Sequence, residues 1–269
     1  MNGRDAHRAE AHIALLIDAD NAPAGKIDVI LTELSTFGVT NVRRAYGNWK
    51  KSELKGWEEK LHEHAIRPMQ QFDYSKGKNA SDMAMVIDAL ELLYTDRPDA
   101  FGIVSSDADF TPLVMHLRAK GAAVYGFGAQ KTPEPFVNAC SRFLYLDRLG
   151  SAEVVEAPAT PEIPVTNAAG IPAKQAQTLR VTPDQLKKDA KLISLLRGAV
   201  IASEDETGWA KVGHVGTHIG NKASFDSRNF GYATLTKLLE ATGAFDLRDA
   251  GTPKVCVRDK RHFLASTVS

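Results

Sequence analysis

The chain has 269 residues, enough for one large domain or two small ones, and 43% hydrophobic with 25% charged residues is typical of a soluble globular protein. Two cysteines, Cys140 and Cys256, are too few for a disulfide framework, so we expect free thiols. No stretch approaches the roughly 18 apolar residues of a membrane span, and the first residues lack the apolar core of a signal peptide; we therefore expect a cytoplasmic protein with no membrane association.

Charge is distributed unevenly along the chain, although the formal net charge is zero. From residue 174 onward there are 15 Lys and Arg against 10 Asp and Glu, and the preceding residues hold 18 against 23. An acidic front is thus joined to a basic back. A basic region of this kind is suited to a polyanion, although the excess alone is small.

Short apolar runs alternate with amphipathic stretches in the front part of the chain. The run at 13–17 has no polar interruption, which is typical of a strand buried on both faces of a parallel sheet. We expect further strands at 42–46, 66–72, 101–104, 122–127 and 143–146, with Pro68 indicating an edge position for the second of these. We expect helices at 23–37, 49–64, 80–94 and 110–120. The alternation predicts an α/β fold with a parallel sheet and helices on both faces.

The helix expected at 80–94 has apolar residues that recur at helical spacing and should face the sheet. They are Met83, Val86, Ile87, Leu90 and Leu93.

A change of composition separates this part from the rest. Residues 151–173 are rich in proline, contain no basic residue and show no periodicity, so they read as an extended linker between domains at 1–150 and 174–269. After the linker, Thr182-Pro183-Asp184 is a helix-start signal, and helices are expected near 192–200, 209–219 and 232–242. A small β element at 255–257, with Phe263, would complete a winged-helix shape.

Four carboxylates follow or open these elements. Asp18 ends the first strand, Asp82 opens the helix at 80–94, and Asp107 and Asp109 follow the strand at 101–104. Parallel strands end at the same edge, where open α/β sheets bind ligands, so these side chains should meet. Carboxylates without His or Cys suit Mg²⁺ or Mn²⁺, and the chemistry they serve best is phosphodiester hydrolysis.

Each of these residues also has a structural reading. Asp20 and Asn21 could cap the following helix, Asp82 could be a first-turn residue that the helix dipole favours, and Asp107 and Asp109 could cap the helix at 110. Asp18 lies inside the strand pattern, where its charge needs a reason. Ser105 and Ser106 are turn residues that could order a carboxylate or bind a phosphate. Lys76 and Lys78 either contact nucleic acid or form a solvated loop.

Three segments resemble a known family in the same order: L-I-D-A-D-N at 16–21, K-N-A-S-D-M-A-M-V-I-D-A-L at 78–90 and I-V-S-S-D-A-D-F-T-P-L-V at 103–114. They look like the NYN domain in its LabA-like branch, over about residues 10–148. The resemblance implies a PIN-like nuclease fold and a metal-dependent ribonuclease centre at Asp18, Asp82 and Asp107, with Asp109 as a fourth acid and Asn21 nearby.

The back of the chain is similar to an OST-HTH, or LOTUS, domain over about residues 182–260. The motifs are G-W-A-K-V-G-H-V-G-T-H-I at 208–219 and F-D-S-R-N-F-G-Y-A-T-L-T-K-L-L-E-A-T-G-A-F at 225–245. The resemblance implies RNA binding or protein docking. Cations that could contact phosphates are Lys222, Arg228, Lys237 and Lys254. Phe230 or Tyr232 could stack on a base, or both could be core aromatics.

Three functions therefore remain open. The first is a Mg²⁺- or Mn²⁺-dependent ribonuclease with an attached RNA-binding module. The second is a binding protein whose acidic site is idle and whose domains scaffold RNA or a protein partner. The third is a phosphatase of the haloacid-dehalogenase type, because Asp18-Ala-Asp20 resembles its nucleophile pair; Ala22 stands where that type has a Thr or similar residue. The oligomeric state cannot be predicted.

Overall fold

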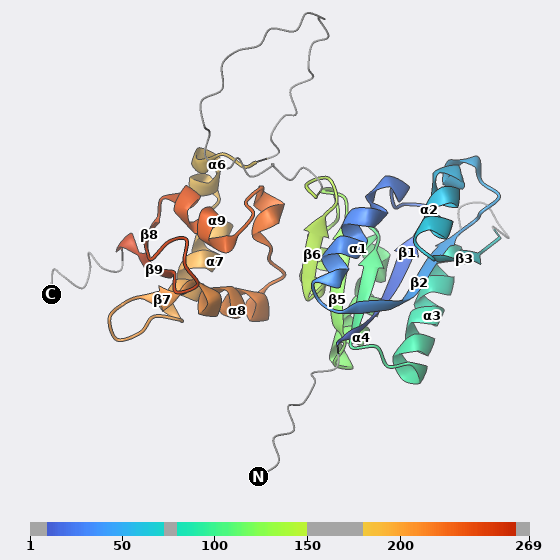
Figure 1. Ribbon diagram of the computed structural model, residues 1–269, viewed down its shortest axis with the longest axis horizontal. Coiled ribbons are helices and arrows are strands. Elements are labelled where there is room, and N and C mark those ends of the chain that lie inside the picture. Colours follow the sequence, from blue (N-terminus) through green and yellow to red (C-terminus); the bar gives the residue numbers. More distant parts are fainter. Residues whose placement is uncertain (1–9, 73–79, 150–179, 262–269) are drawn as a thin grey trace, which may run out of the picture.

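The computed structural model describes residues 10–72, 80–149 and 180–261 (Figure 1). The predicted linker at 151–173 lies outside the described residues, as do Lys76 and Lys78. The described chain forms an N-terminal α/β domain and a C-terminal domain of helices with a small sheet (Figure 1).

The N-terminal domain is built on a six-stranded sheet in the order β3-β2-β1-β4-β5-β6, and every neighbouring pair is parallel. Its strands are β1 (His12–Asp18), β2 (Val39–Gly47), β3 (Arg67–Gln70), β4 (Ala100–Val104), β5 (Ala123–Gly128) and β6 (Arg142–Tyr145). The predicted α/β class is confirmed. The edge position expected from Pro68 is also confirmed, because β3 ends the order on one side and β6 on the other.

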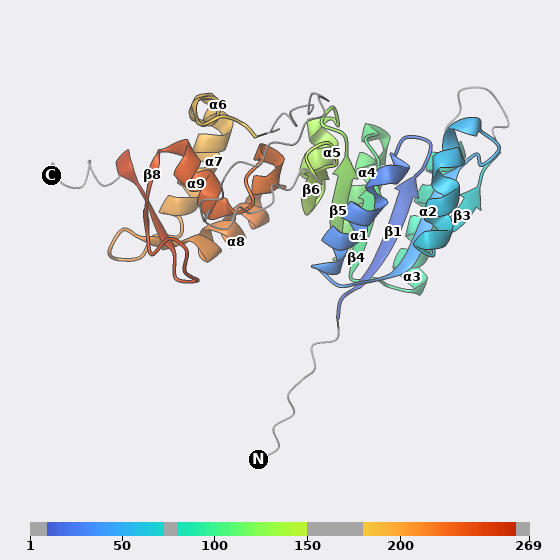
Figure 2. The same ribbon diagram turned by 45° about the horizontal axis from the view of Figure 1, so that its top comes forward.

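Helices cover both faces of this sheet (Figure 2). They are η1 (Ala24–Lys26), α1 (Ile27–Ser35), η2 (Ser52–Trp57), α2 (Glu58–Glu63), α3 (Ala80–Thr95), η3 (Ala108–Phe110), α4 (Thr111–Ala119) and α5 (Glu134–Ala139). Alternate residues of β1 join two separate cores. Leu16 packs with α3, α4 and α5, whereas Leu15 and Ile17 pack with α1 and η2. The strand is therefore apolar on both faces, as its sequence predicts.

Two helices differ from expectation. The stretch at 49–64 is a 3₁₀ segment, η2, followed by the short α2; Gly56, of low helix propensity, lies near their junction. In α3 the predicted inward face is partly wrong, because Met83 and Ile87 are each 60% exposed while Met85 and Ala89 are buried. Apolar residues surround α3 on most sides, so spacing alone does not select the buried face. Helix α5 was not expected.

The C-terminal domain has its own core and a three-stranded antiparallel sheet in the order β7-β9-β8. Its elements are α6 (Pro183–Lys188), α7 (Ala190–Ile201), β7 (Ala210–Lys211), α8 (Val212–Lys222), η4 (Ser227–Phe230), α9 (Leu235–Thr242), β8 (Phe245–Arg248) and β9 (Cys256–Asp259). The expected winged-helix-like architecture is confirmed.

Local signals explain several boundaries in this domain. Thr182 and Gln185 form a capping box at the start of α6, and Asp189 ends α6 while its side chain caps α7. The helix expected at 209–219 begins later, because residues 210–211 pair with β9. Phe263 lies outside the described residues. Cys140 and Cys256 are buried free thiols. Among the described residues, no helix is long and apolar enough to cross a membrane.

Candidate active site

Asp18 is the last residue of β1 and lies at the carboxyl edge of the sheet. The register of the parallel pair β1–β4 sets Ile17 opposite Val104, so Asp18 comes level with the residue that follows β4. That residue is Ser105, and its hydroxyl donates to Asp18 Oδ2 over 2.9 Å. The carboxyl ends of β1 and β4 therefore lie side by side, as predicted.

The carboxylate of Asp18 is buried and only half satisfied. The residue is 1% exposed, and burial raises its pKa above the ordinary value for Asp. Oδ2 accepts hydrogen bonds from Ser105 Oγ and Asn21 Nδ2, each at 2.9 Å, whereas Oδ1 has no hydrogen-bond partner in the described part of the chain. A buried carboxylate oxygen without a donor is costly unless a cation or an ordered water completes it.

The negative charge of Asp18 acts together with that of other carboxylates on Asp82. Asp82 lies in the first turn of α3, half-buried, and its pKa is raised to about 6. Burial is the largest cause, and the negative charges of Asp18, Asp107, Asp20 and Asp109 raise the pKa further, in that order. The four other carboxylates therefore all act electrostatically on Asp82. We call the five residues the acidic cluster.

The expected capping role is present for Asp107. Its Oδ1 accepts from the backbone N–H of Asp109 over 2.8 Å at the start of η3, and its own N–H donates to Ser105 Oγ over 3.1 Å. These contacts fix the loop after β4. They use one carboxylate oxygen of Asp107 for the cap, and capping does not conflict with a place in the cluster.

The expected capping role is not present for Asp20 and Asn21, because η1 begins at Ala24 with Pro23 as its N-cap residue and no side-chain cap. Asn21 instead donates to Asp18. Asp20 accepts from Ser81 Oγ over 2.8 Å and pairs with Lys51 Nζ at 3.2 Å. Asp20 is therefore the member of the acidic cluster that ties the loop after β1 to the start of α3, with its carboxylate engaged by Ser81 and Lys51.

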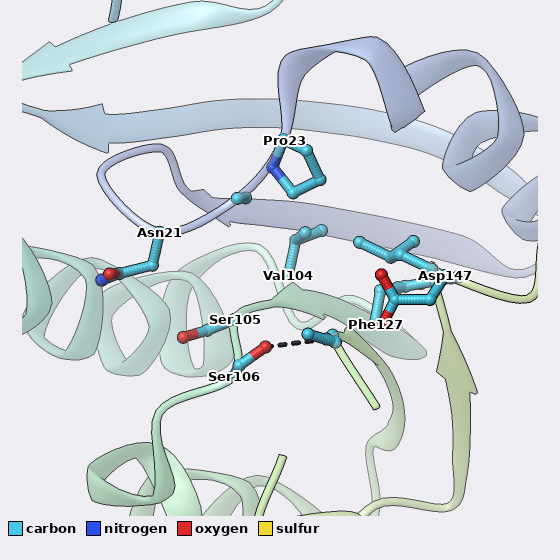
Figure 3. A pocket seen from close by; sticks show the side chains of 11 residues that line it. Asn21, Pro23, Val104, Ser105, Ser106, Phe127 and Asp147 are labelled. Carbon is cyan, nitrogen blue, oxygen red and sulfur yellow. Dashed lines mark hydrogen bonds between the residues drawn. The ribbon is translucent and has the colours of Figure 1, made fainter. Parts of the chain in front are cut away.

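Ser106 lies beside Ser105 but has a different role. Its hydroxyl accepts from the backbone N–H of Ala129 over 2.8 Å and so joins the loops that follow β4 and β5 (Figure 3). A cavity of about 40 Å³ between these loops is lined by Asn21, Ser105, Ser106 and Asp147, among others (Figure 3). It has room for a few water molecules and is too small for a nucleotide.

A polar contact behind the cluster was missed by the sequence analysis. Asp88, buried on the sheet-facing side of α3, accepts hydrogen bonds from Arg44 and from the hydroxyl of Tyr46, both on β2. Burial and the bond to Asp88 raise the pKa of Tyr46, so the phenol stays protonated. Asp88 stands six residues after Asp82 on the same helix and fixes α3 against the sheet. The available signal was Asp88 itself, an acid that falls between Ile87 and Ala89 in the apolar pattern of 80–94.

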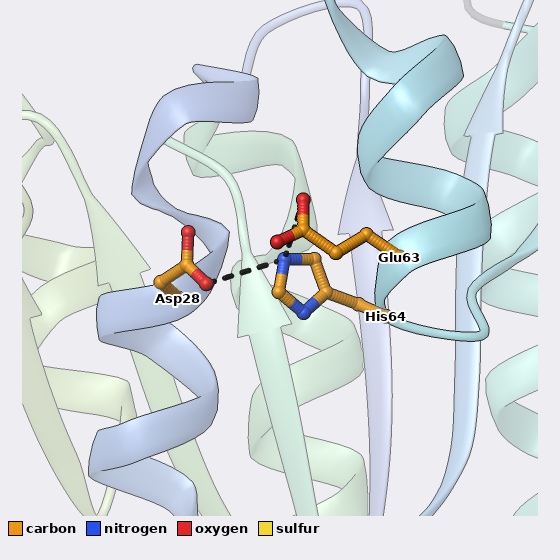
Figure 4. A group of neighbouring side chains, drawn as sticks. All are labelled: Asp28, Glu63 and His64. Atoms are coloured by element: carbon orange, nitrogen blue, oxygen red, sulfur yellow. Dashed lines mark ion pairs between the residues drawn. The ribbon is translucent and has the colours of Figure 1, made fainter.

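A second group of potential ligands lies elsewhere, at Asp28, Glu63 and His64 (Figure 4). His64 Nε2 lies 3.3 Å from Asp28 and 3.8 Å from Glu63. Lys60 pairs with the same two carboxylates, at 3.6 and 2.7 Å. Because a lysine already supplies positive charge, we interpret this group as an ion-pair network that joins α1 to α2.

Two of the side chains expected at an RNA surface are engaged elsewhere. Arg228 donates to Asp226 and to Glu33 of α1, so its guanidinium is bound by two carboxylates. Tyr232 is 1% exposed, and its hydroxyl donates to Val181 O over 2.9 Å. Tyr232 is therefore a core aromatic and not a surface for base stacking. The other expected cations, Lys222, Lys237 and Lys254, stand on α8, on α9 and before β9.

The structure reveals a basic groove of about 820 Å³ that the sequence analysis missed. Its described lining contains no acid and four cations, Lys187, Arg197, Lys260 and Arg261. Arg197 is held by Asp259 at 3.1 Å, and Lys260 donates to Gly243 O over 3.0 Å. Lys187 and Arg261 are exposed. The four residues come from α6, α7 and the two residues that follow β9, so only folding brings them together.

Comparison with known proteins agrees with this arrangement. Residues 12–147 match the NYN domain, and residues 185–257 match the OST-HTH/LOTUS domain. The chain belongs to the NYN domain family. This family has the fold of PIN-like nucleases, and the OST-HTH/LOTUS domain is a type associated with RNA binding. The family assignment and the contacts of Asp20 leave the phosphatase reading without support.

Among relatives, an uncharacterized protein of Methanocaldococcus jannaschii is 32% identical over 127 residues, which are 46% of this chain and 50% of that protein. The NYN chain thus spans about half the length of that relative. A structure of a protein of unknown function from Vibrio parahaemolyticus matches with 18% identity and a TM-score of 0.42, covering 54% of this chain and 96% of that one. An uncharacterized protein from Nitrosomonas europaea matches at 25% identity and a TM-score of 0.25, covering 36% and 92%.

Proposed function

We propose that this protein is a metal-dependent ribonuclease that hydrolyses RNA phosphodiester bonds at the acidic cluster. The observation that carries the proposal is Asp18, a buried carboxylate with one oxygen held by Ser105 and Asn21 and the other without a donor. Such an arrangement is unfavourable unless positive charge is brought to it. Membership of a nuclease-type family supports the same function.

The donor set fits a hard divalent cation. All the ligands offered are carboxylate oxygens, which Mg²⁺ and Mn²⁺ prefer. Asp18, Asp82 and Asp107 would hold the ion, with Asp109 as the fourth acid. When bound, Mg²⁺ or Mn²⁺ polarises the phosphate and lowers the pKa of an attacking water.

The protein's own residues prepare the site. Ser105 and Asn21 fix one oxygen of Asp18, so the other keeps a constant direction. Asp82, with a pKa of about 6, is partly protonated near neutral pH and loses its proton readily when positive charge enters. Asp20 is paired with Lys51, which limits the negative charge facing an incoming phosphate. In the RNA-free protein, each of these features sets the orientation or the charge of a carboxylate at the site.

RNA must also be held, and the basic groove is the surface we propose for its backbone, alongside Lys222, Lys237 and Lys254. Lys76 and Lys78, which lie outside the described residues, keep their proposed contact with nucleic acid. Arg228 does not, because its guanidinium is occupied by Asp226 and Glu33. A cationic groove binds a phosphate chain without regard to sequence, through release of counterions.

The proposal is tested by incubating the full chain with end-labelled single-stranded RNA in Mn²⁺, in Mg²⁺ or in EDTA. We expect shortened products with at least one of the cations and none in EDTA. Intact RNA under all three conditions, with binding detected by a mobility shift, would instead indicate the non-catalytic RNA-binding protein.

A further inference from the structure

The C-terminal domain touches the N-terminal domain at the open edge of the parallel sheet. Strand β6 has β5 on one side and no strand of the described chain on the other. The segment η4 of the C-terminal domain lies against this free edge (Figure 1). An uncovered edge strand carries backbone groups without partners, and proteins usually cover or disrupt it.

Asn229 of η4 satisfies those backbone groups with its side chain. Its Nδ2 donates to Phe143 O over 2.8 Å, and its Oδ1 accepts from Tyr145 N–H over 3.1 Å. These are the groups on either side of Leu144, the pair that one residue of a further parallel strand would bind. The side-chain amide of Asn229 therefore replaces a peptide group of a seventh strand. Because Gly231 has a φ of 81°, the chain can turn away directly afterwards.

Three ion pairs of the described residues join the two domains. Lys191 of α7 and Glu134 of α5 form an exposed pair at 3.4 Å, and the other two pairs involve Glu33 of α1 and Arg142 of β6. Arg228 of the C-terminal domain binds Glu33 of α1, whose side chain is only 13% exposed. Arg142 of β6 lies 3.5 Å from Asp226 of the C-terminal domain, which is 6% exposed. In the pairs of Glu33 and Asp226, each domain supplies one cation and one carboxylate, and the carboxylates are mostly buried while the arginines are 30% and 41% exposed. Separating such a pair leaves a mostly buried carboxylate without its partner.

We propose that the C-terminal domain is docked on β6 in solution, with Asn229 as the positioning residue, instead of swinging freely on its linker. Docking fixes the distance between the basic groove and the acidic cluster. If the proposed nuclease function holds, RNA anchored in the C-terminal domain is cut at a set number of nucleotides from the anchor. The inference about cutting therefore rests on the proposed function, whereas docking itself does not.

The test uses the full chain and Asn229→Asp, which keeps the size of the side chain but removes the donor and sets a carboxylate against Phe143 O. The matched control is Asn221→Asp, on the exposed end of α8. Glu33→Gln is a second variant, which weakens the ion pair to Arg228 without changing the sequence of η4. The direct readout is hydrogen exchange of the Tyr145 amide, whose acceptor is Asn229, together with solution X-ray scattering.

We expect a protected Tyr145 amide in the wild-type chain and exchange that is about tenfold faster in Asn229→Asp. The maximum dimension from scattering should increase in Asn229→Asp and, to a lesser degree, in Glu33→Gln, and should stay constant in Asn221→Asp. An unprotected Tyr145 amide in the wild type, or protection that survives Asn229→Asp, would overturn the docking.

The effect of docking on the position of cleavage is measured separately, from the lengths of the products made from an end-labelled RNA. Wild-type and Asn221→Asp chains should give a narrow set of lengths, and Asn229→Asp a broad set at a similar total rate. The same narrow set from a chain shown to be undocked would overturn the fixed distance. Absence of cleavage in all variants, with the Tyr145 result as expected, would overturn the proposed nuclease function and leave the docking in place.

Discussion

At the scale of single residues, the acidic cluster combines burial and negative charge in a way that lowers the stability of the fold while forming a candidate metal site. Asp18 has a raised pKa because it is buried, and Asp82 has one because burial and four neighbouring charges oppose its ionisation. Ionisation of both carboxyls costs more here than for an exposed Asp, yet a cation site needs them ionised. Conflicts of this kind are typical of functional sites, where substitution can stabilise the fold and remove the activity.

Asp82→Asn should therefore stabilise the metal-free protein near neutral pH. The pKa of Asp82 is about 6 in the folded protein and 3.8 in the reference state. The protonated Asp82 carboxyl stabilises the fold fully at pH values below its pKa in the unfolded chain. This stabilisation is lost as the pH rises through its pKa in the folded protein. We expect the melting temperature of Asp82→Asn in EDTA to exceed that of wild type at about pH 7.5 and to match it at about pH 4.

The control for this prediction is Asp96→Asn, an exposed acid just beyond the other end of α3. It should leave the melting temperature unchanged at both pH values. A lower melting temperature for Asp82→Asn at the higher pH would show that the carboxylate makes a favourable contact there, contrary to the electrostatic account.

Single residues also show what sequence alone can predict about the site. Asp18 was recognisable because a charge ending an apolar run needs a partner, and the parallel order places it beside Ser105. The engagement of Arg228 by Glu33 was not predictable, because the two residues are distant in sequence and belong to different domains. The burial of Tyr232 is equally a matter of packing against a segment far from it in the sequence.

At the scale of elements, α3 links the cluster to the body of the sheet. Its first turn presents Asp82, and Asp88 anchors its middle to Arg44 and Tyr46 of β2. Met83 and Ile87 face solvent although their spacing suits a buried face. The positions and types of most elements were predictable from apolar periodicity, whereas the rotation of α3 depends on the buried contacts of Asp88.

Asp88→Ala should destabilise the protein and disturb the site. Removing the carboxylate leaves Arg44 and the hydroxyl of Tyr46 without their partner, at a cost of about 3 kcal/mol for a largely buried pair. Urea unfolding should show this loss, and the cleavage rate should fall because Asp82 is carried on the same helix. Glu91→Ala, an exposed acid on α3, serves as control and should change stability by less than about 0.5 kcal/mol. Equal stability of the two variants would contradict an anchoring role for Asp88.

At the scale of the whole molecule, the acidic N-terminal part of the chain and the basic C-terminal part form two domains, for which we propose different roles. The acidic cluster repels phosphate until a cation is present, so affinity for RNA has to come largely from cationic surfaces. The basic groove was not predictable, because its four cations come from separate elements. The positive net charge from residue 174 onward indicated that the C-terminal domain is basic, but it could not indicate which surface of that domain carries the groove.

The contribution of the groove can be separated from that of the other lysines. Lys187→Glu with Arg261→Glu should lower RNA affinity on the order of tenfold or more and reduce the salt slope by about 1.4, because each cation bound to a phosphate of single-stranded RNA adds about 0.7 to that slope. The control, Lys55→Glu with Lys120→Glu, makes the same charge change at two exposed lysines of the N-terminal domain, away from the groove and from the other lysines proposed to contact RNA. Fluorescence anisotropy with single-stranded RNA in EDTA, at several salt concentrations, measures both pairs. An equal loss of affinity in the two pairs would indicate a general charge effect and contradict a specific groove.

The central claim, that Asp18 and its neighbours form a catalytic centre for RNA hydrolysis, is tested most directly by single-turnover cleavage with saturating protein. The wild type, Asp18→Asn and Asp96→Asn are compared on one end-labelled single-stranded RNA in Mn²⁺, with thermal melting to confirm that each is folded. The account predicts that Asp96→Asn cuts like the wild type and that Asp18→Asn is slower by on the order of 10³-fold, since several kcal/mol of transition-state stabilisation is lost. A folded Asp18→Asn variant that cuts RNA at the wild-type rate would contradict it.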